Sequence, residues 1–297
     1  MISENLYREL SITTWQELLH AYEGIPDKGS WFFRGVHKSG DFMTSFERAL
    51  VRMYKWTGDE IHQVDHRRLI LQRIGPQTVS NIEFGLIRRF QRQAQHYRST
   101  LPRERNILEW LALMQHFGTP TRLLDWTYSF YVALFFAIDR ADGDCEVWAL
   151  NRSDVVRELR TIWTAQNIRD IDDHDPNLRL EQTFLDVFRR QQNYVCPVNP
   201  YSVNERNMIQ QGIFLCPGNE TVPFEDNLTE LLKTGRVKLI KFVIRDLPDL
   251  RQEIIKQLRD MNMTSATLFP GLDGFAKSLT GLLLFPDILR PSPRYRR

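Results

Sequence analysis

A segment near the middle of the chain predicts a helix without a polar face. Residues 131–138 read Tyr-Val-Ala-Leu-Phe-Phe-Ala-Ile, an unbroken apolar run. A helix over 129–140 that is apolar nearly all round belongs inside a protein core. The run is much shorter than the roughly 20 residues of a membrane span. The chain therefore has to surround this helix with other apolar elements.

The composition is sufficient for that core. The chain has 297 residues, of which 42% are hydrophobic, and it contains 18 Phe, 9 Tyr and 7 Trp. This aromatic content excludes a wholly disordered chain. A chain of this size buries roughly three-quarters of its unfolded surface, so its stability requires neither a metal nor a disulfide.

The cysteines and the first residues bear on the compartment. Cys145, Cys196 and Cys216 are odd in number and form no Cys-x-x-Cys. This argues against a disulfide framework and a zinc knuckle, so we expect no metal and a reducing cytoplasm. The opening MISENLYREL carries acids and no apolar run, so we expect no secretory signal.

Short strands are expected on both sides of a helical block. Strand-like runs rich in Val, Ile and aromatic residues fall at 30–36, 145–150, 212–216 and 237–244. Most of 44–117 has helical character, interrupted by short turns. This arrangement predicts an α+β protein with a small mixed or antiparallel sheet and a large helical portion. We expect a single domain over 1–286, followed by a basic disordered tail over 287–297.

A polar segment lies between two apolar helices, over His116-Phe-Gly-Thr-Pro-Thr-Arg-Leu-Leu-Asp-Trp-Thr127. Its leucines and tryptophan predict a partly buried turn, in which Arg122 and Asp125 bond each other or the backbone, because unpaired buried charges are costly. One interpretation is a polar network that specifies the fold. The other is a pocket wall with donors to a phosphate or ribose, namely Thr119, Thr121, Arg122 and Thr127. His116, at a helix end, either caps that helix or contributes to the site.

A second segment places an arginine among aromatic residues, at Phe32-Phe-Arg-Gly-Val-His37. The period-two alternation of a strand puts Arg34 on the same face as Phe32 and Val36. A guanidinium on such a face requires an anion, either a protein carboxylate or a ligand phosphate. Gly35 permits a close approach by another backbone or by a ligand.

These segments together resemble the FRG-domain family, which takes its name from a Phe-Arg-Gly motif. The resemblance covers residues 31–279 and rests on FFRG, HFGTPTRLLDWT with SFYVALFFAI, ERNMIQQGIF and LFPGLDG, in that order. The HFGTPTRLLDWT block is the specific part, since a lone tripeptide carries little information. The family's biochemical role is poorly defined, so membership identifies the domain more than the activity.

The early Phe-Arg-Gly strand is also similar to the first motif of ADP-ribosyltransferases. That likeness implies an ADP-ribosyltransferase-like core with NAD as substrate, in which Arg34 contacts the phosphates and a residue at Gln211 faces the ribose. It implies a nucleotide site that includes Asp125 and is formed by Phe33, Gly35, His116, Thr119, Thr121, Arg122, Trp126 and Thr127. A toxin or phage-defence effector would be the corresponding biological role, by analogy.

One residue departs from that second pattern. The late position holds Gln211 where those enzymes use a glutamate, and an amide supplies no negative charge to a cationic ribose. Three alternatives follow. Another acid substitutes, with Glu205, Asp125 and Asp273 as candidates; the chain binds a nucleotide without this reaction; or the likeness is accidental.

The charge distribution supports a different partner. The stretch from Arg67 to Arg105 contains nine arginines and two acids, Glu83 and Glu104. Such a stripe suits nucleic acid, which would make the chain a nucleic-acid-binding module. It is also compatible with a solvated helix face. A third possibility is a non-catalytic interaction domain, and the oligomeric state is left open.

Overall fold

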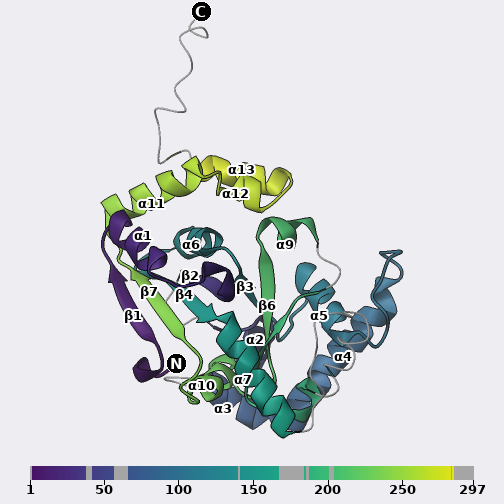
Figure 1. Ribbon diagram of the computed structural model, residues 1–297. Helices are drawn as coiled ribbons and strands as arrows, with labels where there is room; N and C mark the ends of the chain where they lie inside the picture. The colour runs from purple at the N-terminus through teal and green to yellow at the C-terminus, as the bar shows by residue number, and fades with distance from the viewer. Residues whose placement is uncertain are drawn as a thin grey trace, which may run out of the picture.

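A single mixed sheet organises the protein in the computed structural model (Figure 1). The structure describes residues 2–37, 42–56, 66–139, 141–166, 184, 187–200, 204–281 and 283. The strands of the sheet are β1 (Arg8–Ile12), β2 (Trp31–Val36), β3 (Leu124–Thr127), β4 (Cys145–Asn151), β5 (Val195–Val198), β6 (Gly212–Pro217) and β7 (Leu239–Ile244).

The strand order is β1-β7-β4-β2-β3-β6-β5. Within this part of the chain, β1 pairs with β7 in parallel and the other pairs are antiparallel. The long ladder of β2 with β4 runs from Trp31↔Asn151 to Val36↔Glu146. On its other side β2 meets β3 only at Phe33↔Thr127. The middle of the sheet therefore opens between β2 and β3.

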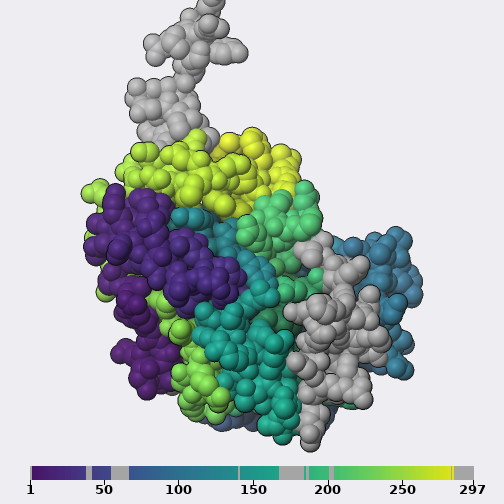
Figure 2. Space-filling view, in the orientation of Figure 1, coloured from purple at the N-terminus to yellow at the C-terminus, as the bar shows by residue number. Residues whose placement is uncertain are grey.

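Helices cover both faces of the sheet. They are α1 (Trp15–Glu23), α2 (Ser45–Trp56), α3 (His66–Ile74), α4 (Pro76–Ala94), α5 (Ile107–His116), α6 (Phe130–Ile138), α7 (Arg152–Ala165), α9 (Glu205–Ile209), α10 (Phe224–Leu232), α11 (Pro248–Asp260), α12 (Ser265–Leu268) and α13 (Leu272–Gly281). One apolar core joins the sheet to α1, α6 and α11, and a second joins it to α5, α7 and α10. In Figures 1 and 2 the C-terminal helices form the upper layer. The α+β class with a mixed sheet is thus confirmed.

The apolar helix α6 lies in the upper core, where Val132, Ala133 and Leu134 are fully buried. It packs directly on β2. A Cβ atom at Gly35 would stand 1.8 Å from the carbonyl oxygen of Ala133 and 2.6 Å from the amide nitrogen of Ala137. Only a glycine allows this approach. Of the two partners the sequence left open for Gly35, the structure places the backbone of α6 against its Cα.

Three strands lie where the sequence predicted none, namely β1, β3 and β5. The most important is β3, because residues 124–127 were predicted to be part of a turn. That prediction was wrong for these four residues, since each pairs with β6, from Leu124↔Leu215 to Thr127↔Gly212. Partners 85–91 positions away in sequence leave no local signal.

Two sequence predictions fall at the ends of the described structure. The basic tail over 287–297 and the domain boundary at 286 lie outside the described residues. Of the helices that are described, none combines the length and apolar character that crossing a membrane requires.

Candidate functional site

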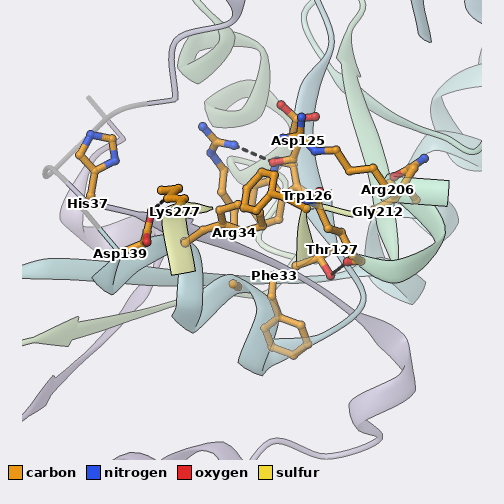
Figure 3. A pocket seen from close by; sticks show the side chains of 17 residues that line it. Phe33, Arg34, His37, Asp125, Trp126, Thr127, Asp139, Arg206, Gly212 and Lys277 are labelled. Carbon is orange, nitrogen blue, oxygen red and sulfur yellow. Dashed lines mark hydrogen bonds and ion pairs between the residues drawn. The ribbon is translucent and has the colours of Figure 1, made fainter. Parts of the chain in front are cut away.

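A cavity of about 330 Å³ opens where β2 and β3 separate (Figure 3). Its walls come from β2, β3, β6, α6, α9 and α13 and from residues that flank these elements. The polar and aromatic residues that line it are Phe33, Arg34, His37, Asp125, Trp126, Thr127, Phe136, Asp139, Arg206, Asn207, Gln210, Phe269 and Lys277. Segments that are far apart in the sequence, around residues 34, 125, 206 and 270, therefore meet here.

Arg34 spans the opening between the two strands. Its Nη1 atom donates a hydrogen bond to the carbonyl oxygen of Asp125 over 2.6 Å, which Figure 3 shows as a dashed line. The bond replaces the ladder contact that β2 and β3 lose beyond Phe33↔Thr127. The side chain is half-buried, so Arg34 both joins the strands and borders the cavity.

Asp125 and Thr127 point to the same face of β3, as alternate strand residues do. The Asp125 side chain is exposed, and its Oδ2 atom accepts a hydrogen bond from Nε2 of Gln115 at 3.1 Å. The Thr127 hydroxyl donates to the carbonyl oxygen of Gln210 at 2.7 Å, which fixes the end of α9 against β3. Strand β3 therefore places the Asp125 carboxylate beside the anchored Thr127 side chain at the cavity wall.

Phe269 is placed between two cations of the cavity. The Arg206 guanidinium lies 4.6 Å from the centre of its ring, and the Lys277 Nζ atom lies 5.3 Å from it. Lys277 also forms an ion pair of 2.6 Å with Asp139. Both interactions are electrostatically favourable, because a ring face carries partial negative charge.

The turn after Phe269 explains part of the LFPGLDG motif. A Cβ at Gly274 would lie 1.8 Å from the Phe269 carbonyl oxygen, so a glycine is required for α13 to return over this turn. The motif thereby brings Lys277 to the cavity. The sequence analysis did not predict Lys277, Phe269 or Arg206 as site residues. The available signal was that Arg206 lies in ERNMIQQGIF and Phe269 in LFPGLDG, two of the segments that resemble the FRG-domain family.

Comparison with protein families gives a match between residues 29–145 and the model of the FRG domain. This segment of the chain is an FRG domain. The matched FRG segment contains Arg34, Asp125, Thr127 and the whole of α6, whereas Arg206, Phe269 and Lys277 lie beyond it. The search of curated proteins gave no match, and the search of solved structures gave none either. The likeness to ADP-ribosyltransferases therefore stays a prediction.

The second arginine of the FRG motifs does not line this cavity. Arg122 is buried, and its guanidinium binds both carboxylate oxygens of Glu83 and lies 3.2 Å from Glu220. Arg122 and Asp125 were predicted to bond each other or the backbone, and their main partners are instead Glu83 and Gln115. Two carboxylates saturate this guanidinium, so it cannot also bind a phosphate in the cavity.

The threonines of this FRG segment divide between the cavity and the core. Thr127 borders the cavity. Thr121 is fully buried, and its hydroxyl donates to Oε1 of Gln115 at 2.6 Å. Thr119 is outside the cavity as well, and its amide donates to the Met114 carbonyl at the end of α5. Two of the three predicted threonine donors therefore serve the turn rather than the pocket wall.

His116 and Gln211 also lie away from the cavity lining. His116 borders a neighbouring hollow with Pro200 and Asn204, and burial, reinforced by the nearby charge of Arg206, lowers its pKa. Gln211 adopts a left-handed backbone conformation at φ 47°. Its carbonyl accepts from the amide of Tyr128, and the neighbouring Gln210 lines the cavity instead.

The predicted aromatic residues reach the cavity from inside the core. Phe33 is fully buried, and its ring contacts those of Tyr22 and Phe130 in the upper core. In Figure 3 this ring points away from the Arg34 guanidinium. Trp126 is also buried and stacks on Phe42. Phe33 and Trp126 thus pack in two different cores, while the half-buried Phe269 and Phe136 supply the more accessible rings.

Proposed function

We propose that the cavity binds a nucleotide and that the protein cleaves the nicotinamide–ribose bond of NAD. The observation that carries this proposal is that Arg34 and Asp125, from two separate motifs, border one cavity that also contains Arg206 and Lys277. Its volume falls within the range of ligand pockets, and a few polar groups converge on an aromatic wall.

The cations support a diphosphate ligand. Arg34 places a planar guanidinium at the cavity wall, where its Nη1 atom holds the Asp125 carbonyl. Within the residues that the structure describes, Arg206 forms no ion pair and contacts the ring of Phe269. Lys277 is held by Asp139. Guanidinium groups bind phosphate through two parallel hydrogen bonds, which makes arginine a specific phosphate ligand.

The aromatic residues support a ligand with a planar ring. Phe136 and Phe269 meet edge to face with ring centres 5.9 Å apart, and both line the cavity. A nicotinamide or adenine ring can lie against such a wall, while Asn207 and Gln210 offer amide groups to its edge. The combination of rings, amides and cations fits a nucleotide better than an inorganic anion.

Asp125 is the acid that the reaction requires. When the bond between ribose C1′ and nicotinamide breaks, its electron pair leaves with nicotinamide and positive charge develops on the ribose. A carboxylate beside the ribose stabilises that charge. The oxygen of a water molecule then bonds to C1′ and its proton passes to solvent, which yields ADP-ribose. Asp125 thus supplies the negative charge that the amide of Gln211 lacks.

Calorimetry with NAD and chromatographic measurement of released nicotinamide test this function. We expect Asp125→Asn to retain NAD binding and to lower nicotinamide release by about 100-fold, the order expected when an electrostatic group is lost. Arg34→Lys should weaken NAD binding while the protein stays folded, because lysine lacks the fork. Arg152→Lys is the matched control, since Arg152 lies outside the cavity against Tyr128.

The outcomes separate binding from catalysis. Binding of NAD without nicotinamide release would reduce the proposal to a nucleotide-binding domain, and absence of both would overturn it. Release of nicotinamide by an NAD-cleaving enzyme would suit a toxin or phage-defence effector. We place such an activity in the cytoplasm, where the three free buried cysteines stay reduced.

A further inference from the structure

The outward face of α4 carries three arginines that form no ion pair with the described residues. Arg88, Arg89 and Arg92 are exposed and line one shallow hollow together with Gly85 and Gln93. We call these five residues the α4 basic face. Within the described chain none of its arginines forms an ion pair, whereas Arg67 and Arg68 are bound to Glu225 and Asp226. Figures 1 and 2 place α4 at the lower right, away from the C-terminal helices that border the cavity.

Gly85 adds a second observation on the same face. It lies in the middle of a 19-residue helix, where glycine is much less favourable than alanine. A Cβ at this position would meet no atom within 4 Å, and its backbone has no left-handed angle. Packing therefore does not require a glycine. Its absent side chain instead leaves the helix backbone open between the arginines, so that a ligand can approach closely.

The surroundings of the α4 basic face favour nucleic acid over other polyanions. Residues 81–105 contain six arginines and two acids, of which Glu83 is buried against Arg122. Tyr97, just beyond the helix, is 87% exposed. The apolar side of α4 faces the core through Val79 and Ile87, which leaves no apolar stripe to enter a membrane. Exposed arginines with a projecting aromatic ring are the elements that bind single strands.

We propose that the α4 basic face binds single-stranded nucleic acid. Arg88, Arg89 and Arg92 contact the phosphates, the backbone at Gly85 allows the strand to lie close, and Tyr97 stacks on a base. The binding does not depend on the cavity or on NAD cleavage. It gives the protein a second ligand at a separate surface.

Fluorescence anisotropy with labelled 20-nucleotide oligo-dT and oligo-U, over a range of NaCl concentrations, tests the proposal. We expect Arg88→Gln with Arg92→Gln to weaken binding at least tenfold at low salt. The slope of log affinity against log salt should fall by about 1.4, which corresponds to two lost phosphate contacts. Tyr97→Ala should weaken binding about tenfold through the lost stacking.

Two further variants separate this site from general charge. The pair Lys238→Gln and Lys256→Gln removes the same charge from exposed positions elsewhere and should leave affinity unchanged. Gly85→Ala should raise the melting temperature and weaken binding. The proposal is overturned by absence of oligonucleotide binding at low salt or by equal losses in both double variants. Binding only to a poly-glutamate peptide or to phosphatidylserine vesicles would also overturn it.

Discussion

At the scale of single residues, Gly35 is a position where the fold tolerates little change. A methyl group there would overlap backbone atoms of Ala133 and Ala137, which cannot rotate away as a side chain can. We predict that Gly35→Ala destabilises the protein by about 3 kcal/mol, at the upper end of overpacking effects. Urea unfolding measures this. Gly143→Ala, where a Cβ meets nothing within 4 Å, is the control and should change stability little; equal losses would contradict the packing argument.

The three residues of the Phe-Arg-Gly motif show how far sequence reasoning reached. It placed Arg34 beside an anion-accepting site and left two partners open for Gly35. The structure makes Phe33 a core ring, Arg34 a link to the Asp125 carbonyl and Gly35 the contact with α6. The residue type restricts which interactions a position can make, but the partner residue depends on how distant segments fold together. No local sequence pattern indicates that partner.

At the scale of elements, a buried carboxylate joins the starts of two helices. Glu47 accepts the amide of Thr44 at the start of α2 and the amide of Phe224 at the start of α10, each at 2.7 Å. Burial, with the nearby charge of Glu225, raises its pKa to about 8. In the unfolded chain the same carboxyl ionises near pH 4.5, so the folded state binds more protons between these values.

The consequence is a loss of stability as pH rises from about 5 to about 8. We predict that this one group lowers the free energy of unfolding by at most about 1.4 kcal/mol per pH unit in that window. Glu47→Gln should remove that part of the slope in urea unfolding at several pH values. Glu17→Gln is the matched control, because Glu17 completes an exposed capping box on α1. This variant should keep the decrease in stability between about pH 5 and pH 8. An unchanged slope in Glu47→Gln would refute the assignment.

The elements also differ in how well the sequence revealed them. The helix over 129–140 and the strand over 30–36 were visible from apolar runs and turn residues, and α6 and β2 lie there. The strand β3 was not visible, because its four residues include exposed Asp125 and depend on β6 for pairing. This gap matters for the site, since β3 is the element that brings Asp125 and Thr127 beside Arg34.

At the scale of the whole molecule, the two arginines of the motifs serve opposite layers. Arg34 borders the open cavity beneath the C-terminal helices, whereas Arg122 joins α4, the start of β3 and the segment after β6 through Glu83 and Glu220. Ser80 and Gln191 complete this buried network with hydrogen bonds of 2.5 Å and 3.4 Å to Glu220.

This division gives different consequences for the two arginines. We predict that Arg122→Ala lowers the free energy of unfolding by about 3–5 kcal/mol, because two buried carboxylates lose their cation. Lys233→Ala, which removes an exposed ion pair with Glu230, should cost less than about 1 kcal/mol. Urea unfolding compares them, and calorimetry on Arg122→Ala that remains folded should show unchanged nucleotide affinity. Lower affinity in that folded protein, with stability intact, would instead place Arg122 in the site and contradict the separation of the two layers.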